Sequence, residues 1–263
     1  MPGPVRLPAV AVLTLLLAGC GGDTSPAALS PDPTLASSGP AALSFSGPSA
    51  FVEIPDAPSL DLRERWTLEA WIRPAAPGGT FQHVLSKWNG GGDASYTLEV
   101  HAGHLRVAIH DGISPSQALE SLAELTPDTW QHVAATYQAG SLRLYIGGRL
   151  DRVAHGVIAP MNSTRPLSIG HEGPPFNGWQ YAGAIDEVRV WRTARTERQL
   201  QETAARPLSG REAGLVGYWR FDEGGGQVAR DRSASGNHGR LGATREPDAS
   251  DPAWTLDVAI PGL

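Results

Sequence analysis

The chain contains the run Gly183-Ala184-Ile185-Asp186-Glu187-Val188-Arg189-Val190-Trp191, in which apolar and charged residues alternate and predict one β-strand. Strict alternation places Asp186 on the same face as Val188 and Val190, which we expect to be a buried face. A carboxylate buried there is costly unless a cation, backbone amides or an arginine compensates its charge. Asp186 is therefore the first candidate for a structural or functional site.

Similar alternating runs, separated by glycine turns such as Gly147-Gly148, fill most of the chain beyond residue 50. They predict strands at 51–54, 66–73, 84–88, 96–100, 105–110, 131–137, 142–146, 149–153, 167–170, 185–191 and 215–221. One helix is predicted near 196–205, because Thr196 and Gln199 fit a capping box and Pro207 ends the run. The turn-rich residues after 221 are expected to add an edge strand and loop to the same domain.

The run at 183–191 resembles the Gly-x-Ile-Asp-Glu-Val-Arg-hydrophobic-Trp/Tyr motif of LamG-like jelly-roll domains, a branch of the concanavalin A-like lectin/glucanase group. Further pieces of that pattern occur in the expected order, over roughly residues 42–241. They are Ala42-Leu-Ser-Phe-Ser-Gly47, Phe51-Val-Glu-Ile-Pro55, Trp66-Thr-Leu-Glu-Ala-Trp-Ile72, Trp130-Gln-His-Val-Ala-Ala-Thr-Tyr137, Leu142-Arg-Leu-Tyr-Ile-Gly-Gly148, Pro166-Leu-Ser-Ile-Gly170 and Gly214-Leu-Val-Gly-Tyr-Trp-Arg-Phe-Asp-Glu223. The resemblance implies an all-β jelly-roll sandwich of two antiparallel sheets. It specifies the fold more than the function, since such folds host many kinds of recognition.

The N-terminal residues predict export and a lipid anchor. The apolar stretch at 9–18 is too short to span a bilayer but suits the core of a signal peptide. It ends in Leu17-Ala18-Gly19-Cys20, which resembles the bacterial lipobox, in which Cys20 is acylated after cleavage. The alternative is an ordinary secretory signal with an incidental cysteine.

Three segments follow from this interpretation. Residues 1–19 are a lipoprotein signal peptide, residues 20–41 are the acylated cysteine and a flexible Gly/Ser/Pro/Ala tether, and residues 42–260 are the jelly-roll domain, which includes a strand and loop segment at 214–242. We expect the protein at the cell envelope, with the outer membrane or cell surface favoured because Gly21 is not an aspartate.

The composition of the chain limits the classes of molecule that it is expected to bind. The net charge is −6 and no basic patch is apparent, which argues against nucleic acid. Cys20 is the only cysteine, so no intramolecular disulfide forms. Nothing in the sequence indicates the oligomeric state.

Calcium is the one cofactor that the resemblance implies. LamG-like relatives often hold a structural Ca²⁺ with the aspartate at the position of Asp186 and a second aspartate in an N-terminal Phe-Asp-Gly. That second position is Ser46 here, which removes a ligand. Asp222 and Asp231 are weaker candidates that could compensate. The alternative is that Asp186 accepts hydrogen bonds from loop amides or pairs with an arginine.

Two loops have the composition of a sugar site, in which aromatic faces are combined with a few planar polar groups. The candidate ligand-binding residues are Trp88, Asn89, Asp93, Phe176, Asn177, Trp179 and Tyr181. The alternative is that these aromatic residues cover the edges of the core. Trp66, Trp71, Trp130, Trp191 and Trp219 lie inside strand patterns and are expected in the core or on a sheet.

Three functions of different classes remain open at this point. Non-catalytic binding of a carbohydrate or glycoconjugate predicts exposed tryptophans around a groove, and a protein-interaction or adhesion module predicts a flat apolar patch. A glycoside hydrolase needs two carboxyls converging in one cleft. Asp186 and Glu187 are adjacent on a strand and point to opposite faces, so the sequence predicts no enzyme. The orientations of Glu69, Asp93, Glu99 and Glu172 distinguish the hydrolase from the other two.

Overall fold

The computed structural model describes Met1, Gly3 and residues 40–46, 49–75, 81–88, 92–172 and 178–260. Apart from Met1 and Gly3, the predicted signal peptide lies outside the described residues, as do Cys20 and almost all of the tether. Among the described residues, no helix is long and apolar enough to cross a membrane.

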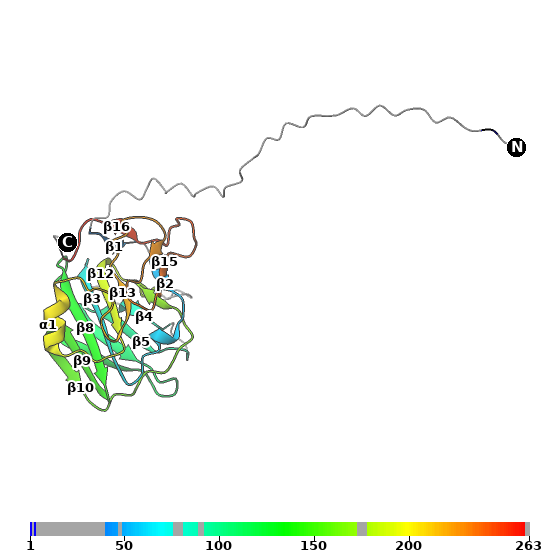
Figure 1. Ribbon diagram of the computed structural model, residues 1–263. Coiled ribbons are helices and arrows are strands. Elements are labelled where there is room, and N and C mark those ends of the chain that lie inside the picture. Colours follow the sequence, from blue (N-terminus) through cyan, green and yellow to red (C-terminus); the bar gives the residue numbers. More distant parts are fainter. Residues whose placement is uncertain are drawn as a thin grey trace. The chain divides into compact units, whose positions relative to one another are not determined.

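The described chain forms two antiparallel sheets of eight strands each, which confirms the predicted jelly-roll sandwich (Figure 1). Sheet A has the order β10 (Arg149–Ala154), β9 (Ser141–Ile146), β8 (Gln131–Gln138), β3 (Arg65–Pro74), β12 (Gly183–Trp191), β1 (Ala42–Phe45) and β16 (Ala253–Thr255), with β13 (Leu215–Trp219) also paired to β12. Sheet B has the order β14 (Val228–Ala229), β15 (Gly239–Leu241), β2 (Val52–Ile54), β11 (Leu167–Ile169), β4 (Phe81–Ser86), β5 (Tyr96–His101), β6 (His104–Ile109) and β7 (Gln117–Glu124). A short 3₁₀ helix, η1 (Pro58–Leu60), follows β2.

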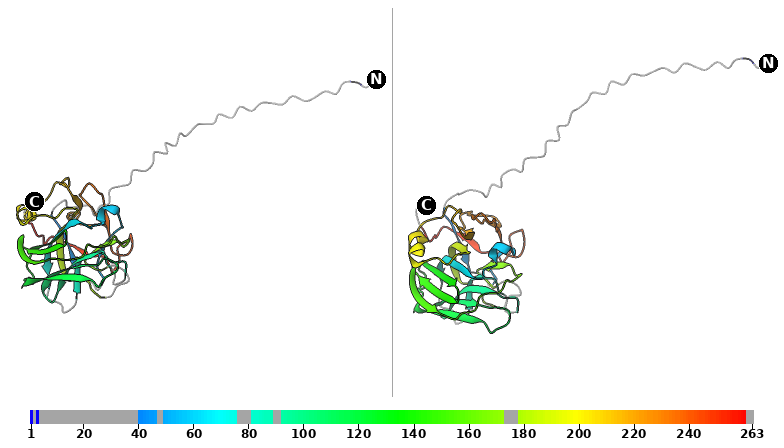
Figure 2. Two further views of the ribbon diagram at one scale, coloured as in Figure 1. Left: turned by 90° about the horizontal axis from the view of Figure 1, so that it is seen from below. Right: turned by 60° about the horizontal axis from the view of Figure 1, so that its bottom comes forward.

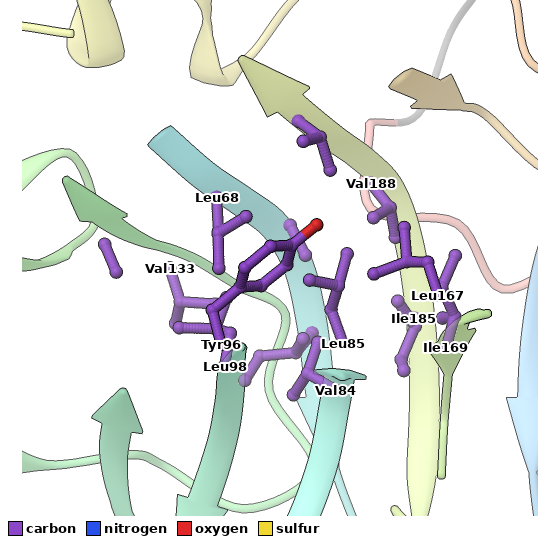
Figure 3. Packing of buried hydrophobic residues seen from close by; sticks show 14 of the residues in the cluster. Leu68, Val84, Leu85, Tyr96, Leu98, Val133, Leu167, Ile169, Ile185 and Val188 are labelled. Atoms are coloured by element: carbon purple, nitrogen blue, oxygen red, sulfur yellow. The ribbon is translucent and has the colours of Figure 1, made fainter. Parts of the chain in front are cut away.

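The main core lies between the two sheets, whose ribbons Figure 2 shows from two further directions, and is built from the inward-facing positions of both. Figure 3 shows Tyr96 of β5 among side chains of both sheets, including Leu68 and Leu85. Tyr96 is fully buried, and its hydroxyl donates to the carbonyl of Leu60 at 3.0 Å, which satisfies its one polar group.

Helix α1 (Glu197–Ala204) lies against the outer face of sheet A, beside β8 and β9 (Figure 1). Thr196 forms the predicted capping box with Gln199. Leu200 packs on Ala134 and Tyr145, which fixes the helix to the sheet. Helix α1 therefore covers part of the outer face of sheet A, over β8 and β9.

The sequence patterns missed β7, whose residues are Gln-Ala-Leu-Glu-Ser-Leu-Ala-Glu. Alanine, leucine and glutamate favour helices, so local propensity opposes the observed strand. Pairing with β6 overrides that propensity, and the buried Leu119 and Ser121 supply the inward contacts. The segment after residue 221 forms the predicted edge, because β15 pairs with β2 and β14 pairs with β15.

Candidate functional site

The outer face of sheet B contains a pocket of about 160 Å³. β4, β5 and β6 form its floor, and two tryptophans from flanking loops form its walls. It is lined by Phe81, His83, Trp88, Thr97, Glu99, Arg106, Ala108, Ser116 and Trp179.

Cross-strand register puts the charged floor residues in one row. His83 lies opposite Glu99, Glu99 opposite Arg106, and Arg106 opposite Glu120, so the row crosses four adjacent strands. A register shift between His83 and Leu85 marks a bulge, whose extra residue lets His83 keep its place on the outer face. The row therefore depends on this bulge.

The buried ion pair in the floor consists of Glu99 and Arg106. Glu99 is only 2% exposed and accepts a hydrogen bond from Arg106, and Nε2 of His83 lies 3.3 Å from its second carboxylate oxygen. Burial, together with the nearby His171 and Arg106, lowers the pKa of His83 to about 3. The His83 ring is thus neutral at neutral pH, and a proton on Nε2, the nitrogen that faces the Glu99 carboxylate, leaves Nδ1 as an acceptor.

Two floor groups have no hydrogen-bond partner among the described residues. They are Nδ1 of His83 and the hydroxyl oxygen of Thr97, both of which are shielded from solvent. A buried polar atom without a partner costs stability, and a polar ligand in this pocket would remove part of that cost.

The wall residue Trp179 is positioned by the backbone of β4. The amide of His83 donates to the carbonyl of Trp179 at 3.1 Å, so residues 179–180 extend the sheet locally. The indole lies parallel to the His83 ring, with centroids 5.8 Å apart, and edge-on to Phe81 at 5.5 Å. Arg106 in turn lies 4.8 Å from the Phe81 ring centroid. These contacts give the wall a defined orientation.

Trp88 stands just beyond the other end of β4, edge-on to His110 with ring centroids 5.4 Å apart. Both indoles are only partly buried, so part of each ring is accessible. The two aromatic residues border a polar floor, which is the arrangement that a small polar ligand with apolar faces requires.

The structure brings together only part of the predicted ligand set. Trp88 and Trp179 line the pocket, while Asn89, Phe176 and Asn177 lie outside the described residues. Asp93 is not in the lining, because its carboxylate accepts from the amide and hydroxyl of Thr164 and ties two loops together.

Tyr181 is a correction to the predicted set. Its side chain is fully buried in the core, edge-on to Phe45 with centroids 6.4 Å apart. The residue after Gln180 turns inward as the chain approaches β12, so this aromatic ring belongs to the core rather than to a ligand site.

Sequence reasoning missed the floor residues His83, Thr97 and Arg106, and treated Glu99 only as a residue whose orientation mattered. A signal was present in β5, where Thr97, Glu99 and His101 alternate with Tyr96, Leu98 and Val100. That alternation identifies a polar outer face, but it does not show which strands lie beside it.

Asp186 does not share the inner face with Val188 and Val190, so the prediction of strict alternation was wrong. The pairing Asp186–Trp71 is followed by Arg189–Glu69, which puts one extra residue into β12, and Glu187 adopts a φ of 51°. Asp186 remains buried at 4% exposure and accepts hydrogen bonds from the amides of Glu187 and Ala259. Loop amides therefore bind it, as the alternative interpretation held.

Of the residues implied for calcium, Ser46 does not reach Asp186, and Asp222 and Asp231 are bound to other groups. Ser46 would be four residues away along the β1–β12 pair, or roughly 13 Å. Asp222 pairs with Arg220 at 2.7 Å, and Asp231 accepts from the amides of Tyr218, Ser233 and Asn237. No described group of three or more Asp, Glu, His or Cys side chains could hold a metal ion. These residues do not fit a calcium site, and calcium binding stays a prediction.

Asp186 makes folding stability depend on pH. Burial, with Glu187 and Asp222 nearby, raises its pKa to about 7. Because the folded state then holds the proton more tightly than the unfolded state, the contribution of Asp186 to stability is greatest at low pH and falls as pH rises from about 4 to about 7. We expect Asp186→Asn to be more stable than the wild type at pH 8 by about 1–3 kcal/mol, since removing the charge outweighs one lost backbone hydrogen bond.

Urea unfolding in EDTA at pH 5 and pH 8 measures this difference, with the exposed Asp128→Asn as the matched control. A variant less stable than the wild type at pH 8 would contradict it. Stabilisation of the wild type, but not of Asp186→Asn, by added Ca²⁺ would show that a cation does bind there.

Comparison with known proteins identifies the family to which this chain belongs. The family model described as the concanavalin A-like lectin/glucanases superfamily matches residues 46–201, more than half of the chain. The chain belongs to this superfamily. The match confirms the resemblance seen in the run at 183–191.

Solved structures with a similar fold resemble this chain at low sequence identity. A candidate carbohydrate-binding protein from Bacteroides ovatus ATCC 8483 is 22% identical with a TM-score of 0.66, over 84% of this chain and 61% of that one. The CBM40 domain of the Ruminococcus gnavus IT-sialidase, bound to α2,3-sialyllactose, is 13% identical with a TM-score of 0.50, over 61% of this chain and 95% of that one. At these identities the likeness concerns the fold alone.

One curated relative is an enzyme subunit. The N,N-dimethylformamidase beta subunit of Paracoccus aminophilus is 23% identical in an alignment of 245 residues that covers 79% of this chain. The chain spans only 31% of that subunit.

Proposed function

We propose that this chain is a non-catalytic carbohydrate-binding module. The observation that carries the proposal is the pocket on sheet B, where two partly exposed indoles border a polar floor. Sugar rings offer apolar C–H faces to indoles and hydroxyls to polar groups, so both components of the pocket have a counterpart in a saccharide.

Charge favours an uncharged sugar in this pocket. The positive charge of Arg106 is already matched by Glu99, and Glu120 lies next in the same row. An acidic sugar would meet excess negative charge, whereas neutral hydroxyls can bond to Thr97 and to the edges of the ion pair.

The geometry gives little support to glycoside hydrolysis. That chemistry uses two carboxyls on either side of the scissile bond, and Glu99 is the only carboxylate among the described lining residues. Glu69 lies on the outer face of sheet A, and Asp93 is engaged with Thr164. The amidase relative is much longer than this chain, so its activity does not transfer to this pocket.

The test is a glycan and polysaccharide array probed with residues 33–263, which form one compact unit, in calcium and again in EDTA. Binding of neutral glycans supports the proposal, and loss of that binding in EDTA would add a metal to it. Absence of any glycan binding would move the function to protein recognition.

We further propose that a lipid on Cys20 holds the module at the cell envelope. The support is the lipobox-like Leu17-Ala18-Gly19-Cys20 and the fact that the chain has no other cysteine. Diacylation of such a residue gives stable membrane attachment.

We expect Cys20→Ser to abolish incorporation of labelled palmitate and to shift the protein from the membrane fraction to the soluble fraction of expressing bacteria. No second cysteine exists, so the change disturbs no disulfide. Equal membrane association of the two proteins would contradict the anchor.

A further inference from the structure

A second cleft, of about 570 Å³, lies at one end of sheet A. β12 pairs antiparallel with β3, with Trp191 opposite Thr67, so the residues that precede β3 and those that follow β12 meet at this end. The cleft is lined by residues 61–65 together with Pro58, Asn162 and Arg192. It is separate from the pocket on sheet B, with which it shares no lining residue.

Three arginines concentrate positive charge in this cleft. Arg63, Arg65 and Arg192 are all exposed, and none makes an ion pair with any residue that the structure describes. The chain as a whole is acidic, with a net charge of −6, so the cleft is a local exception.

The carboxylates of the lining compensate only part of this charge. Nζ of the buried Lys87 lies 2.7 Å from Asp56 and 3.4 Å from Asp61, so two carboxylates share that one lysine. Asp61 and Glu64 are the two acidic residues of the lining. Three guanidinium groups against these two carboxylates leave the cleft with about one excess positive charge.

Guanidinium groups bind oxyanions through paired N–H donors, and three of them around one cleft can bind more than one anionic group. A nucleic acid is disfavoured because the acidic remainder of the surface would repel a long phosphate backbone. We propose that this cleft binds an anionic polysaccharide through its sulfate or carboxylate groups, at a site distinct from the neutral-sugar pocket on sheet B.

The full chain, purified in detergent, tests this with three probes. Dextran sulfate presents sulfate esters, polygalacturonate presents carboxylates, and unmodified dextran is the uncharged control. We expect the wild type to bind one or both charged polymers more tightly than dextran, with affinity falling as NaCl is added.

Two triple variants with the same change in net charge separate the cleft from general electrostatics. The cleft variant carries Arg63→Gln, Arg65→Gln and Arg192→Gln, and the control carries Arg149→Gln, Arg230→Gln and Arg245→Gln, which are also exposed. We expect the cleft variant to bind at least about tenfold more weakly and the control to lose less than about threefold. Thermal unfolding of both variants checks that the fold is intact.

Equal losses in the two variants would overturn the proposal, as would wild-type binding no stronger than that to dextran. Tighter binding of a short DNA duplex than of either charged polymer would overturn the polysaccharide as occupant. The variant Trp179→Ala changes only the pocket on sheet B and therefore distinguishes the two sites. If this variant binds the charged polymers as the wild type does, the result supports the proposal.

Discussion

Replacing Trp179 with alanine is expected to reduce binding of neutral glycans by about 30-fold or more, because a central aromatic residue typically contributes about 2 kcal/mol or more to binding. The indole forms one wall of the pocket and lies parallel to the neutral His83 ring. Its removal eliminates the flat apolar surface against which a sugar ring would stack.

The fold should tolerate this change. Trp179 is only partly buried, and its link to β4 runs through the backbone, where the amide of His83 donates to its carbonyl. Trp130→Ala is the matched control, since this indole is also partly buried but lies before β8, where its Nε1 donates to Asp257. Isothermal titration with the best array ligand compares the two variants with the wild type.

Thr97→Val tests the polar floor of the pocket on sheet B while leaving the volume of the side chain almost unchanged. The Thr97 hydroxyl has no partner among the described residues, so we expect the variant to unfold at the same urea concentration as the wild type or a higher one. Weaker glycan binding by this equally stable variant would place the hydroxyl in contact with the ligand. Unchanged binding by Trp179→Ala and Thr97→Val together would exclude this pocket as the sugar site.

Arg106 is a less informative position to mutate, despite its place in the floor. Its removal would leave the buried Glu99 without a compensating cation, and that cost would be mixed with any loss of ligand contacts. Trp179 and Thr97 avoid this problem because neither makes an ion pair.

Much of the sandwich could be predicted from the sequence because its strands alternate and its helix has a capping box. Apart from β7, whose composition favours a helix, the errors lie where the backbone geometry departs from ideal alternation. Glu187 adopts a positive φ, which is uncommon for a residue other than glycine and cannot be read from the sequence. The extra residue that this places in β12 puts Asp186 on the opposite face from the predicted one. The bulge in β4 also breaks the alternation there, so the strand was predicted to begin at Val84 whereas it begins at Phe81.

The candidate site was predictable only in part for a related reason. Indoles in glycine-rich loops are visible in a sequence, so Trp88 and Trp179 could be selected. The row from His83 to Glu120 requires four strands in the correct order and register, and long-range pairing is not encoded in any one segment. Tyr181 was misplaced because one residue separates the wall of the pocket from the core.

The buried polar network beneath α1 explains much of the 183–191 motif. Nε1 of Trp191 donates to Glu69 at 2.6 Å, and Arg195 and His132 donate to the same carboxylate at 2.8 and 2.9 Å. Arg189 and Glu187 pair beside it, and Tyr218 donates to Glu187. The motif thus fastens the segment that carries α1 to sheet A, and its role is structural.

Glu69→Gln is expected to lower the free energy of unfolding by about 3–5 kcal/mol, the usual cost of breaking a buried ion pair. Glu69 is 1% exposed, so Arg195 would lose its counter-charge where water cannot replace it. The amide of glutamine would also present a second donor to the Nε2–H of His132. Glu202→Gln, which breaks only the exposed pair with Arg198 at 2.7 Å, is the matched control and should cost about 0.5 kcal/mol or less.

Glu69→Gln should also change how the free energy of unfolding declines at acid pH. Burial alone would raise the pKa of Glu69, but the hydrogen bond from His132 and the charges of Arg189 and Arg195 lower it to about 2. A depressed carboxylate contributes stability that is present above pH 4.5 and is lost as pH falls towards 2, about 3 kcal/mol in all. Urea unfolding between pH 2.5 and pH 7 should therefore show a wild-type decline that is shallower in Glu69→Gln. If the free energy of unfolding fell equally with pH in the two proteins, Glu69 would not be ionised in the folded state. The ion pair between Glu69 and Arg195 would then not exist as described.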